Sequence, residues 1–75
     1  MDLGRDEDTP AHERLSDREF EVLRKMASGK TIGQIAQELH LSVPTVSTYR
    51  ARILEKMGMS TNADLIRYAV SHHLV

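Results

Sequence analysis

The sequence contains no cysteine, and this absence excludes both a disulfide framework and a thiolate metal site. Long hydrophobic runs are also absent, because the longest uncharged apolar stretch is far shorter than the roughly 20 residues that a membrane span requires. The chain does not open with a basic segment followed by an apolar one, as a secretory signal would. We therefore expect a cytoplasmic protein without membrane contact, stabilised by helix packing or by a partner.

What the chain does have is the composition of one small folded domain. Its 75 residues leave no room for a second domain, because ordinary domains run to roughly 100–150 residues. Apolar residues make up 40% of the chain and charged residues 28%, close to the globular averages of roughly 45–50% and 25%. This balance argues against disorder throughout the chain.

The net charge of -1 conceals a strong asymmetry along the chain. Residues 1–21 carry three basic and eight acidic side chains, a sum of -5, whereas residues 22–75 carry seven basic and three acidic ones, a sum of +4. A basic body behind an acidic leader is compatible with an anionic partner, although an ordinary mixed surface explains these charges equally well.

Residues 1–14 are predicted to be a flexible acidic linker or tail. They include Gly4, Pro10 and an acidic run at positions 6–8, and they offer almost no apolar side chain that could pack. Such a segment is compatible with the end of an interdomain linker and also with a natural N-terminus. The folded domain is accordingly expected to span residues 15–75.

Four amphipathic patterns predict helices at about residues 16–28, 32–40, 43–57 and 62–72. Each pattern begins at a hydroxyl residue that can cap a helix, and these residues are Ser16, Thr31, Ser42 and Thr61. Gly29 suits the left-handed conformation that often follows a helix end. With no strand signal, the predicted fold is all-α, a compact four-helix bundle that contains a helix-turn-helix.

The helix-turn-helix consists of the second and third predicted helices, which are joined by about three residues: His40 at the end of the second helix, Leu41 and the cap residue Ser42. In such a pair the later helix can enter the major groove of DNA, which is about 12 Å wide. A wheel of about 100° per residue divides the third helix into two sides. The side expected to be buried carries Val46, Ile53 and Met57. The opposite side is small and polar, and there Thr48, Ala51 and the flanking Ser47 could approach base edges.

Two other interpretations of this pattern remain open from the residues alone. A solvated helix face with incidental arginines would show the same distribution of side chains. A small helical protein-interaction module without DNA affinity, whose grooves bind a partner helix, would also fit. Salt dependence separates these classes, because affinity for DNA falls linearly with the logarithm of salt concentration and hydrophobic docking does not follow that rule.

A series of short motifs runs in a fixed order through all four predicted helices. The motifs are Leu15-Ser16-Asp17-Arg18-Glu19, Val22-Leu23, Ala27-Ser28-Gly29, Gln34-Ile35-Ala36, Leu41-Ser42, Thr45-Val46, Ile53-Leu54 and Lys56-Met57-Gly58. In this order and spacing, over about residues 14–74, the chain resembles the LuxR-type helix-turn-helix domain, also called the NarL/FixJ or GerE-like domain.

The resemblance implies a bacterial transcription factor that binds double-stranded DNA at specific sequences. Domains of this family are commonly the output domains of two-component response regulators, which act downstream of a phosphorelay. The implied base-reading residues are Ser47, Thr48 and Ala51, and the implied DNA-backbone contacts are Thr45, Arg50, Arg52 and Lys56. A homodimer on DNA is expected through the fourth helix, at Ala63, Ile66 and Val70. RNA polymerase and a receiver domain that is absent from this chain are further candidate partners.

The chain departs from the family pattern at three places. Ile32-Gly33 stands where many members carry Asn-Lys, Ser47 where lysine is frequent, and Tyr49 where histidine is frequent. Fewer charges on the third helix imply weaker nonspecific binding to DNA.

Nothing in the sequence indicates an enzyme, a metal site or a cofactor. His72 and His73 are adjacent, so on a helix they would face about 100° apart, and no third ligand is near in sequence. The serines lack a Gly-x-Ser-x-Gly setting, and Ser16 and Ser42 are better explained as helix caps. We therefore expect no catalytic residue, no bound metal and no cofactor.

Overall fold

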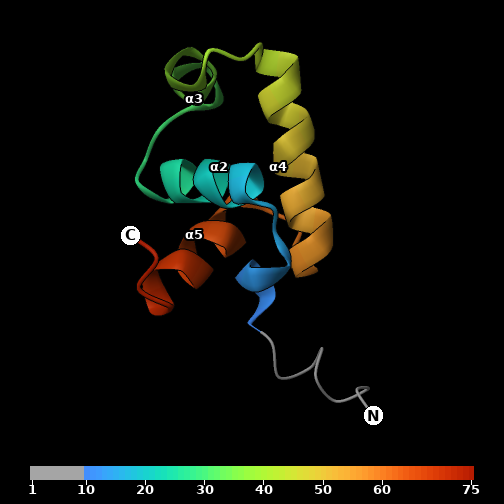
Figure 1. The fold of residues 1–75 in the computed structure, drawn as a ribbon. Helices are drawn as coiled ribbons and strands as arrows, with labels where there is room; N and C mark the ends of the chain where they lie inside the picture. Colours follow the sequence, from blue (N-terminus) through green and yellow to red (C-terminus); the bar gives the residue numbers. More distant parts are fainter. Residues whose placement is uncertain (1–9) are drawn as a thin grey trace.

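The computed structural model of the chain describes residues 10–75 and contains only helices and turns in that range. A short 3-10 helix, η1 (Ala11–Arg14), precedes four α-helices, which are α2 (Asp17–Ala27), α3 (Ile32–Leu39), α4 (Val43–Met57) and α5 (Asn62–Ser71) (Figure 1). The all-α fold predicted from the sequence is confirmed, and each predicted α-helix boundary agrees to within one residue. No helix within residues 10–75 has the length and apolar character required to cross a membrane.

Each α-helix begins at the predicted cap. At the start of α2 the Ser16 hydroxyl accepts a hydrogen bond from the Glu19 amide at 3.2 Å, and the Glu19 carboxylate accepts one from the Ser16 amide at 2.9 Å. The caps of the following helices are Thr31, Ser42 and Thr61, each with a side-chain oxygen bound to the amide three residues later. These bonds satisfy backbone donors that the helix itself leaves unpaired.

Two left-handed residues turn the chain between the first three α-helices. Gly29 follows α2 with a φ of 99°, the conformation expected from the sequence. His40 ends α3 with a φ of 58° and a ψ of 42°, so this helix stops one residue earlier than predicted. The Leu41 amide then donates to the Ala36 carbonyl at 2.8 Å. The turn of His40, Leu41 and Ser42 is therefore short, and it starts α4 beside α3 (Figure 1).

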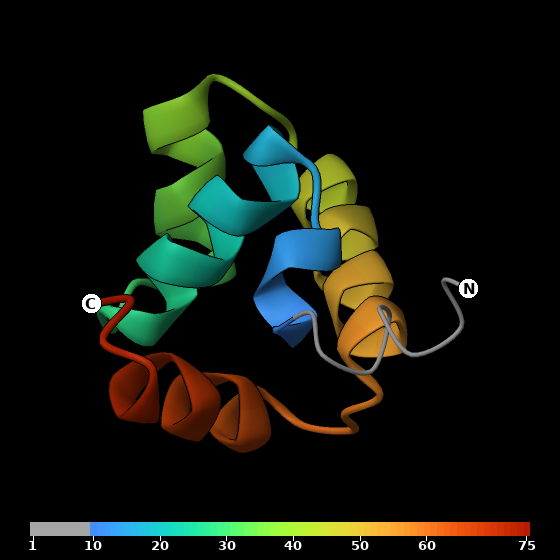
Figure 2. The same cartoon turned by 60° about the horizontal axis from the view of Figure 1, so that its bottom comes forward.

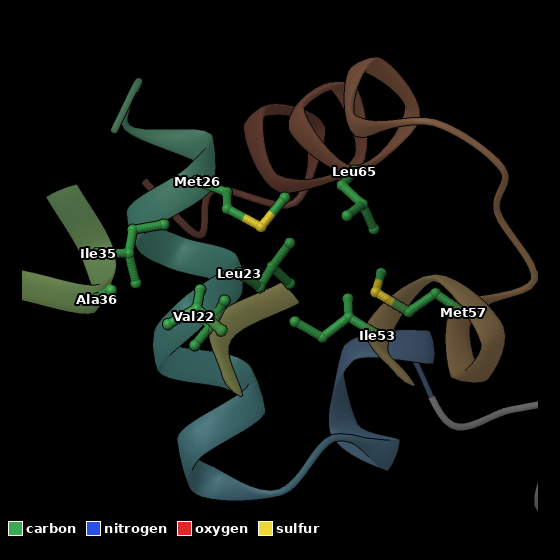
Figure 3. Packing of buried hydrophobic residues seen from close by; sticks show 9 residues of the cluster. Val22, Leu23, Met26, Ile35, Ala36, Ile53, Met57 and Leu65 are labelled. Carbon is green, nitrogen blue, oxygen red and sulfur yellow. The ribbon is translucent and has the colours of Figure 1, made fainter. Parts of the chain in front are cut away.

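Helix α2 lies at the centre of the core, because it packs against α3, α4 and α5. Figure 2 shows α2 between α3 and α4, with α5 running along one end of this layer. The buried apolar residues come from all four α-helices: Val22, Leu23, Met26, Ile35, Ala36, Val46, Ile53, Met57, Leu65 and Ala69. In Figure 3 the side chains of Leu23, Ile53 and Leu65 point toward a common centre. This packing holds α4 on one side of the molecule.

The packed part of the chain begins before the boundary that the sequence indicates at Leu15. Residues 11–14 form η1 rather than a flexible segment, and Ala11 packs against the core. The Tyr68 hydroxyl on α5 accepts a hydrogen bond from the His12 amide at 3.3 Å and lies 2.9 Å from His12 Nδ1. A local pattern does not reveal this contact, because its two residues are 56 positions apart. The predicted linker at residues 1–9 lies outside the described residues.

Candidate nucleic-acid interface

Helix α4 presents two chemically different sides, as the sequence predicts. Val46, Ile53 and Met57 are buried against the rest of the domain. Ser47, Thr48 and Ala51 are exposed on the other side, and we call these three residues the reading strip. Burial of the first set orients the helix about its own axis, so the small side chains of the reading strip point away from the core.

The reading strip offers hydrogen-bond acceptors and methyl groups to a partner. Thr48 Oγ1 donates a hydrogen bond to the Pro44 carbonyl at 3.0 Å, which leaves its lone pairs and its methyl group for other contacts. A hydroxyl lone pair can accept from the amino group of adenine or cytosine in the major groove. The methyl groups of Thr48 and Ala51 can contact the methyl group of thymine. Short side chains also allow close approach of the α4 backbone to base edges.

A pair of hydroxyl groups, one from the cap residue Ser42 and one from Thr45, lies at the start of α4. Thr45 Oγ1 lies 2.8 Å from Ser42 Oγ, and the Thr45 amide donates to the same Ser42 oxygen at 3.3 Å. The helix dipole makes this end of α4 attractive to negative charge. Thr45 is therefore placed where a hydroxyl could contact a phosphate.

Two arginines bracket the reading strip. On a wheel of about 100° per residue, Arg50 and Arg52 lie on opposite flanks, each roughly 100° from the centre of the strip. Arg50 is half-buried, and its Nη1 donates to Asn62 Oδ1 at 3.1 Å. Arg52 is exposed and forms no hydrogen bond or ion pair within residues 10–75. Among residues 10–75, one flanking arginine of α4 thus has a hydrogen-bond partner and the other has none.

Lys56, the third basic residue of α4, is bound to a buried carboxylate. Its Nζ donates to Glu19 Oε1 at 2.8 Å, and only 4% of the Glu19 side chain is exposed, against 41% for Lys56. Burial by itself would raise the pKa of Glu19, but the hydrogen bond and charge of Lys56, together with the hydrogen bonds from Ser16, lower the pKa below its ordinary value. This ion pair between Lys56 and Glu19 was not predicted from the sequence. A signal was present, because Glu19 lies four residues before the buried Leu23 and therefore on the buried side of α2.

We expect Lys56→Met to destabilise the domain by about 1–3 kcal/mol at neutral pH, because the buried carboxylate of Glu19 would lose its cation. The measurement is the free energy of unfolding in urea. Lys30→Met is the matched control, since it removes a lysine from the exposed Glu38 while Lys25 remains bound to the same carboxylate. The loss for Lys30→Met should be much smaller, and equal losses would contradict a special role for the buried pair.

The destabilisation by Lys56→Met should also depend on pH. Because the folded-state pKa of Glu19 is lowered, the ionised carboxylate stabilises the fold above its ordinary pKa of 4.5, and this contribution is lost as the pH falls through the folded-state pKa. The difference between wild type and Lys56→Met should therefore be greatest near neutral pH and shrink in acid. The pKa of Glu38 is also lowered, by hydrogen bonds from Lys25 and Lys30, but both proteins share this effect and it cancels in the comparison.

Helix α5 has apolar side chains on its exposed side. Leu65 and Ala69 are fully buried, whereas 37% of Ile66 and 57% of Val70 are exposed and Ala63 is exposed beside them. The sequence left open whether all the apolar positions of this helix belong to the core. The structure shows that Ala63, Ile66 and Val70 do not, and we call these three residues the α5 patch.

His72, the first of the two adjacent histidines near the C-terminus, packs against aromatic rings. The His72 ring stacks on Tyr68 with centroids 3.9 Å apart, and its centroid lies 6.1 Å from that of His12. In the part of the chain that the structure describes, no three His, Asp or Glu side chains come together as a metal site would require.

A helix-turn-helix whose second helix turns small polar side chains outward between basic residues has the architecture of a major-groove DNA-binding domain. The family described as "GerE: Bacterial regulatory proteins, luxR family" matches residues 13–69. The chain belongs to this family, as its motifs suggested, and it is a DNA-binding domain of a transcription regulator rather than an enzyme. Family membership favours DNA binding over the alternative of a protein-interaction module.

Relatives with this domain are much longer than the chain. A protein of Pseudomonas aeruginosa is 46% identical over 72 residues, which cover 96% of this chain and 35% of the relative. Fimbriae Z protein of Salmonella typhimurium is 44% identical over 61 residues, or 81% of this chain and 29% of the relative. Transcriptional regulatory protein LiaR of Bacillus subtilis is 41% identical over 64 residues, which cover 85% of this chain and 30% of the relative. The chain therefore spans 29% to 35% of the length of these relatives. No solved structure gives a significant match to the chain.

Proposed function

We propose that this domain reads specific double-stranded DNA sites by placing α4 in the major groove. Ser47, Thr48 and Ala51 face base edges in this arrangement. The observation that carries the proposal is the exposure of these three small side chains between two arginines, on the side of α4 opposite its buried residues.

Four further residues of α4 contact the DNA backbone in this proposal: Thr45, Arg50, Arg52 and Lys56. Arg52 is exposed and has no partner within residues 10–75, so its whole charge is available to a phosphate. A lysine ammonium group has three N–H donors. The hydrogen bond from Lys56 to Glu19 uses one of them, so the others can bind a phosphate oxygen of DNA. Because Glu19 offsets its charge, we expect Lys56 to contribute less to affinity than Arg52 does.

The domain functions as a homodimer on paired half-sites, with contacts through the α5 patch. A single small domain makes few phosphate contacts and binds weakly at physiological salt, whereas two joined domains add their contacts. The exposed apolar side chains of Ile66 and Val70 support this arrangement.

We place this domain at the output end of a cytoplasmic two-component response regulator. In this view a receiver domain outside this chain receives a phosphorelay signal, and the DNA-bound domain contacts RNA polymerase. The length of the relatives supports a second domain, because the region shared with LiaR is 30% of that protein.

Thr48→Leu tests the placement of α4. A bulky apolar side chain in the reading strip should change affinity for the specific site by about 1–3 kcal/mol, because it alters contacts at a base edge. Affinity is measured by fluorescence anisotropy on a duplex obtained by selection from genomic fragments, with a random-sequence duplex as the control. Unchanged specific affinity in a variant that keeps its helical circular dichroism would show that α4 is placed wrongly.

A further inference from the structure

The side chain of Arg50 is tied to the first residue of α5. Arg50 Nη1 donates to Asn62 Oδ1 at 3.1 Å, and Asn62 directly follows the cap residue Thr61. The hydrogen bond therefore joins α4, which carries the reading strip, to the start of the helix that carries the α5 patch. Arg52, on the other flank of the reading strip, has no such support within residues 10–75.

We propose that Asn62 is a positioning residue that holds the Arg50 guanidinium for a phosphate on one side of the major groove. The inference rests on the proposed function, because it assumes that α4 enters that groove. The two DNA strands place phosphates along both edges of the groove, and the two arginines lie on the two flanks of the reading strip. Asn62 acts through Arg50 and need not touch DNA itself.

The physical advantage is a smaller entropy loss on binding. A free arginine loses much of its rotamer freedom when it binds a phosphate, and this loss weakens the complex. Arg50 is half-buried and already hydrogen-bonded before DNA arrives, so it has less freedom to lose. A guanidinium carries several N–H donors, and a single bond to Asn62 leaves others for a phosphate oxygen.

A neutral partner suits this role better than an acidic one. Elsewhere in the domain the basic side chains of Lys56 and Arg67 lie beside carboxylates, those of Glu19 and Asp64. The amide oxygen of Asn62 accepts the hydrogen bond without cancelling the positive charge of Arg50. That charge therefore remains available to displace counterions from DNA, which is the source of salt-dependent affinity.

The test compares single and double variants. We expect Asn62→Ala to weaken binding to specific and random duplexes alike by about three- to tenfold, with an unchanged salt slope, because the charge remains but its orientation is lost. Arg50→Ala should weaken binding and reduce the salt slope by about 1. In the Arg50→Ala background, Asn62→Ala should have no further effect, because the two residues act through one contact.

Two more variants sharpen the result. Asn62→Asp keeps an acceptor for Arg50 but cancels its charge, so it should reduce the salt slope by about 1. Ser60→Ala removes a neutral polar group two residues earlier and should leave affinity unchanged. Thermal unfolding of every variant checks that the fold is retained.

Two results would each overturn this inference while leaving the proposed function intact. One is wild-type affinity in Asn62→Ala. The other is an equal loss of affinity from Asn62→Ala in the wild-type and Arg50→Ala backgrounds. A wild-type salt slope in Asn62→Asp would count against it in the same way. If the wild-type domain showed no salt-dependent binding to any duplex, the proposed function and this inference would both fall.

Discussion

Leu23→Ala is expected to lower the free energy of unfolding by about 2–5 kcal/mol, the usual cost of a cavity left by a truncated core leucine. Leu23 is fully buried on the central helix α2, and its side chain faces Ile53 and Leu65 from two other helices (Figure 3). A domain of this size is stable by only about 5–10 kcal/mol in total. The variant should therefore be largely unfolded at a temperature at which the wild type is still folded, as circular dichroism during heating would show.

Val43→Ala provides the control for this effect. It also shortens an aliphatic side chain, but Val43 is 49% exposed on the first turn of α4. Its free energy of unfolding should stay within about 0.5 kcal/mol of the wild type. Similar losses for Leu23→Ala and Val43→Ala would mean that the stability of the domain does not reside in the core around α2.

Val70→Glu is expected to weaken binding to a duplex with two half-sites by about a hundredfold, because it removes the gain that comes from joining two domains. Val70 is 57% exposed, against 37% for Ile66, so a charge there should not disturb the core. The half-sites should lie about one helical turn apart, roughly 34–36 Å. A patch this small should pair only weakly, and we expect the free domain to be largely monomeric in dilute solution.

Two comparisons isolate pairing from general effects of charge. Binding to a duplex with one half-site should be nearly unchanged in Val70→Glu, and Ile66→Glu should behave in the same way. Val75→Glu adds the same charge at an exposed valine outside α5 and should keep cooperative binding. Equal losses on the two duplexes would contradict a dimer contact at α5.

The helices and the two sides of α4 could be predicted because they depend on neighbouring residues. Ser16 and Glu19 form a capping box across three positions, and that bond needs no information from the rest of the fold. Val46 and Ile53 share a side because of helical periodicity, which also leaves Thr48 and Ala51 on the outer side. These local rules account for the agreement between predicted and observed helices.

The contacts of the basic residues could not be predicted in the same way. Arg50, Arg52 and Lys56 look alike in the sequence as cationic side chains on one helix. In the structure they differ, because Lys56 meets a buried carboxylate, Arg50 meets a neutral amide and Arg52 has no partner within residues 10–75. Each difference changes how much charge or freedom the side chain retains for DNA.

By itself, the sequence determined the helix starts and the buried and exposed sides of α4, because caps and periodicity act within about one helical turn. It also determined the family, because the motifs keep their order along the chain. The tertiary structure alone decided that residues 11–14 pack, through His12 and Tyr68, and that Lys56 binds Glu19 across 37 positions. Hydrogen bonds between separate elements require atoms to come within about 3 Å of each other. Only the packing of η1 near α5, and of α2 against α4, brings those atoms together.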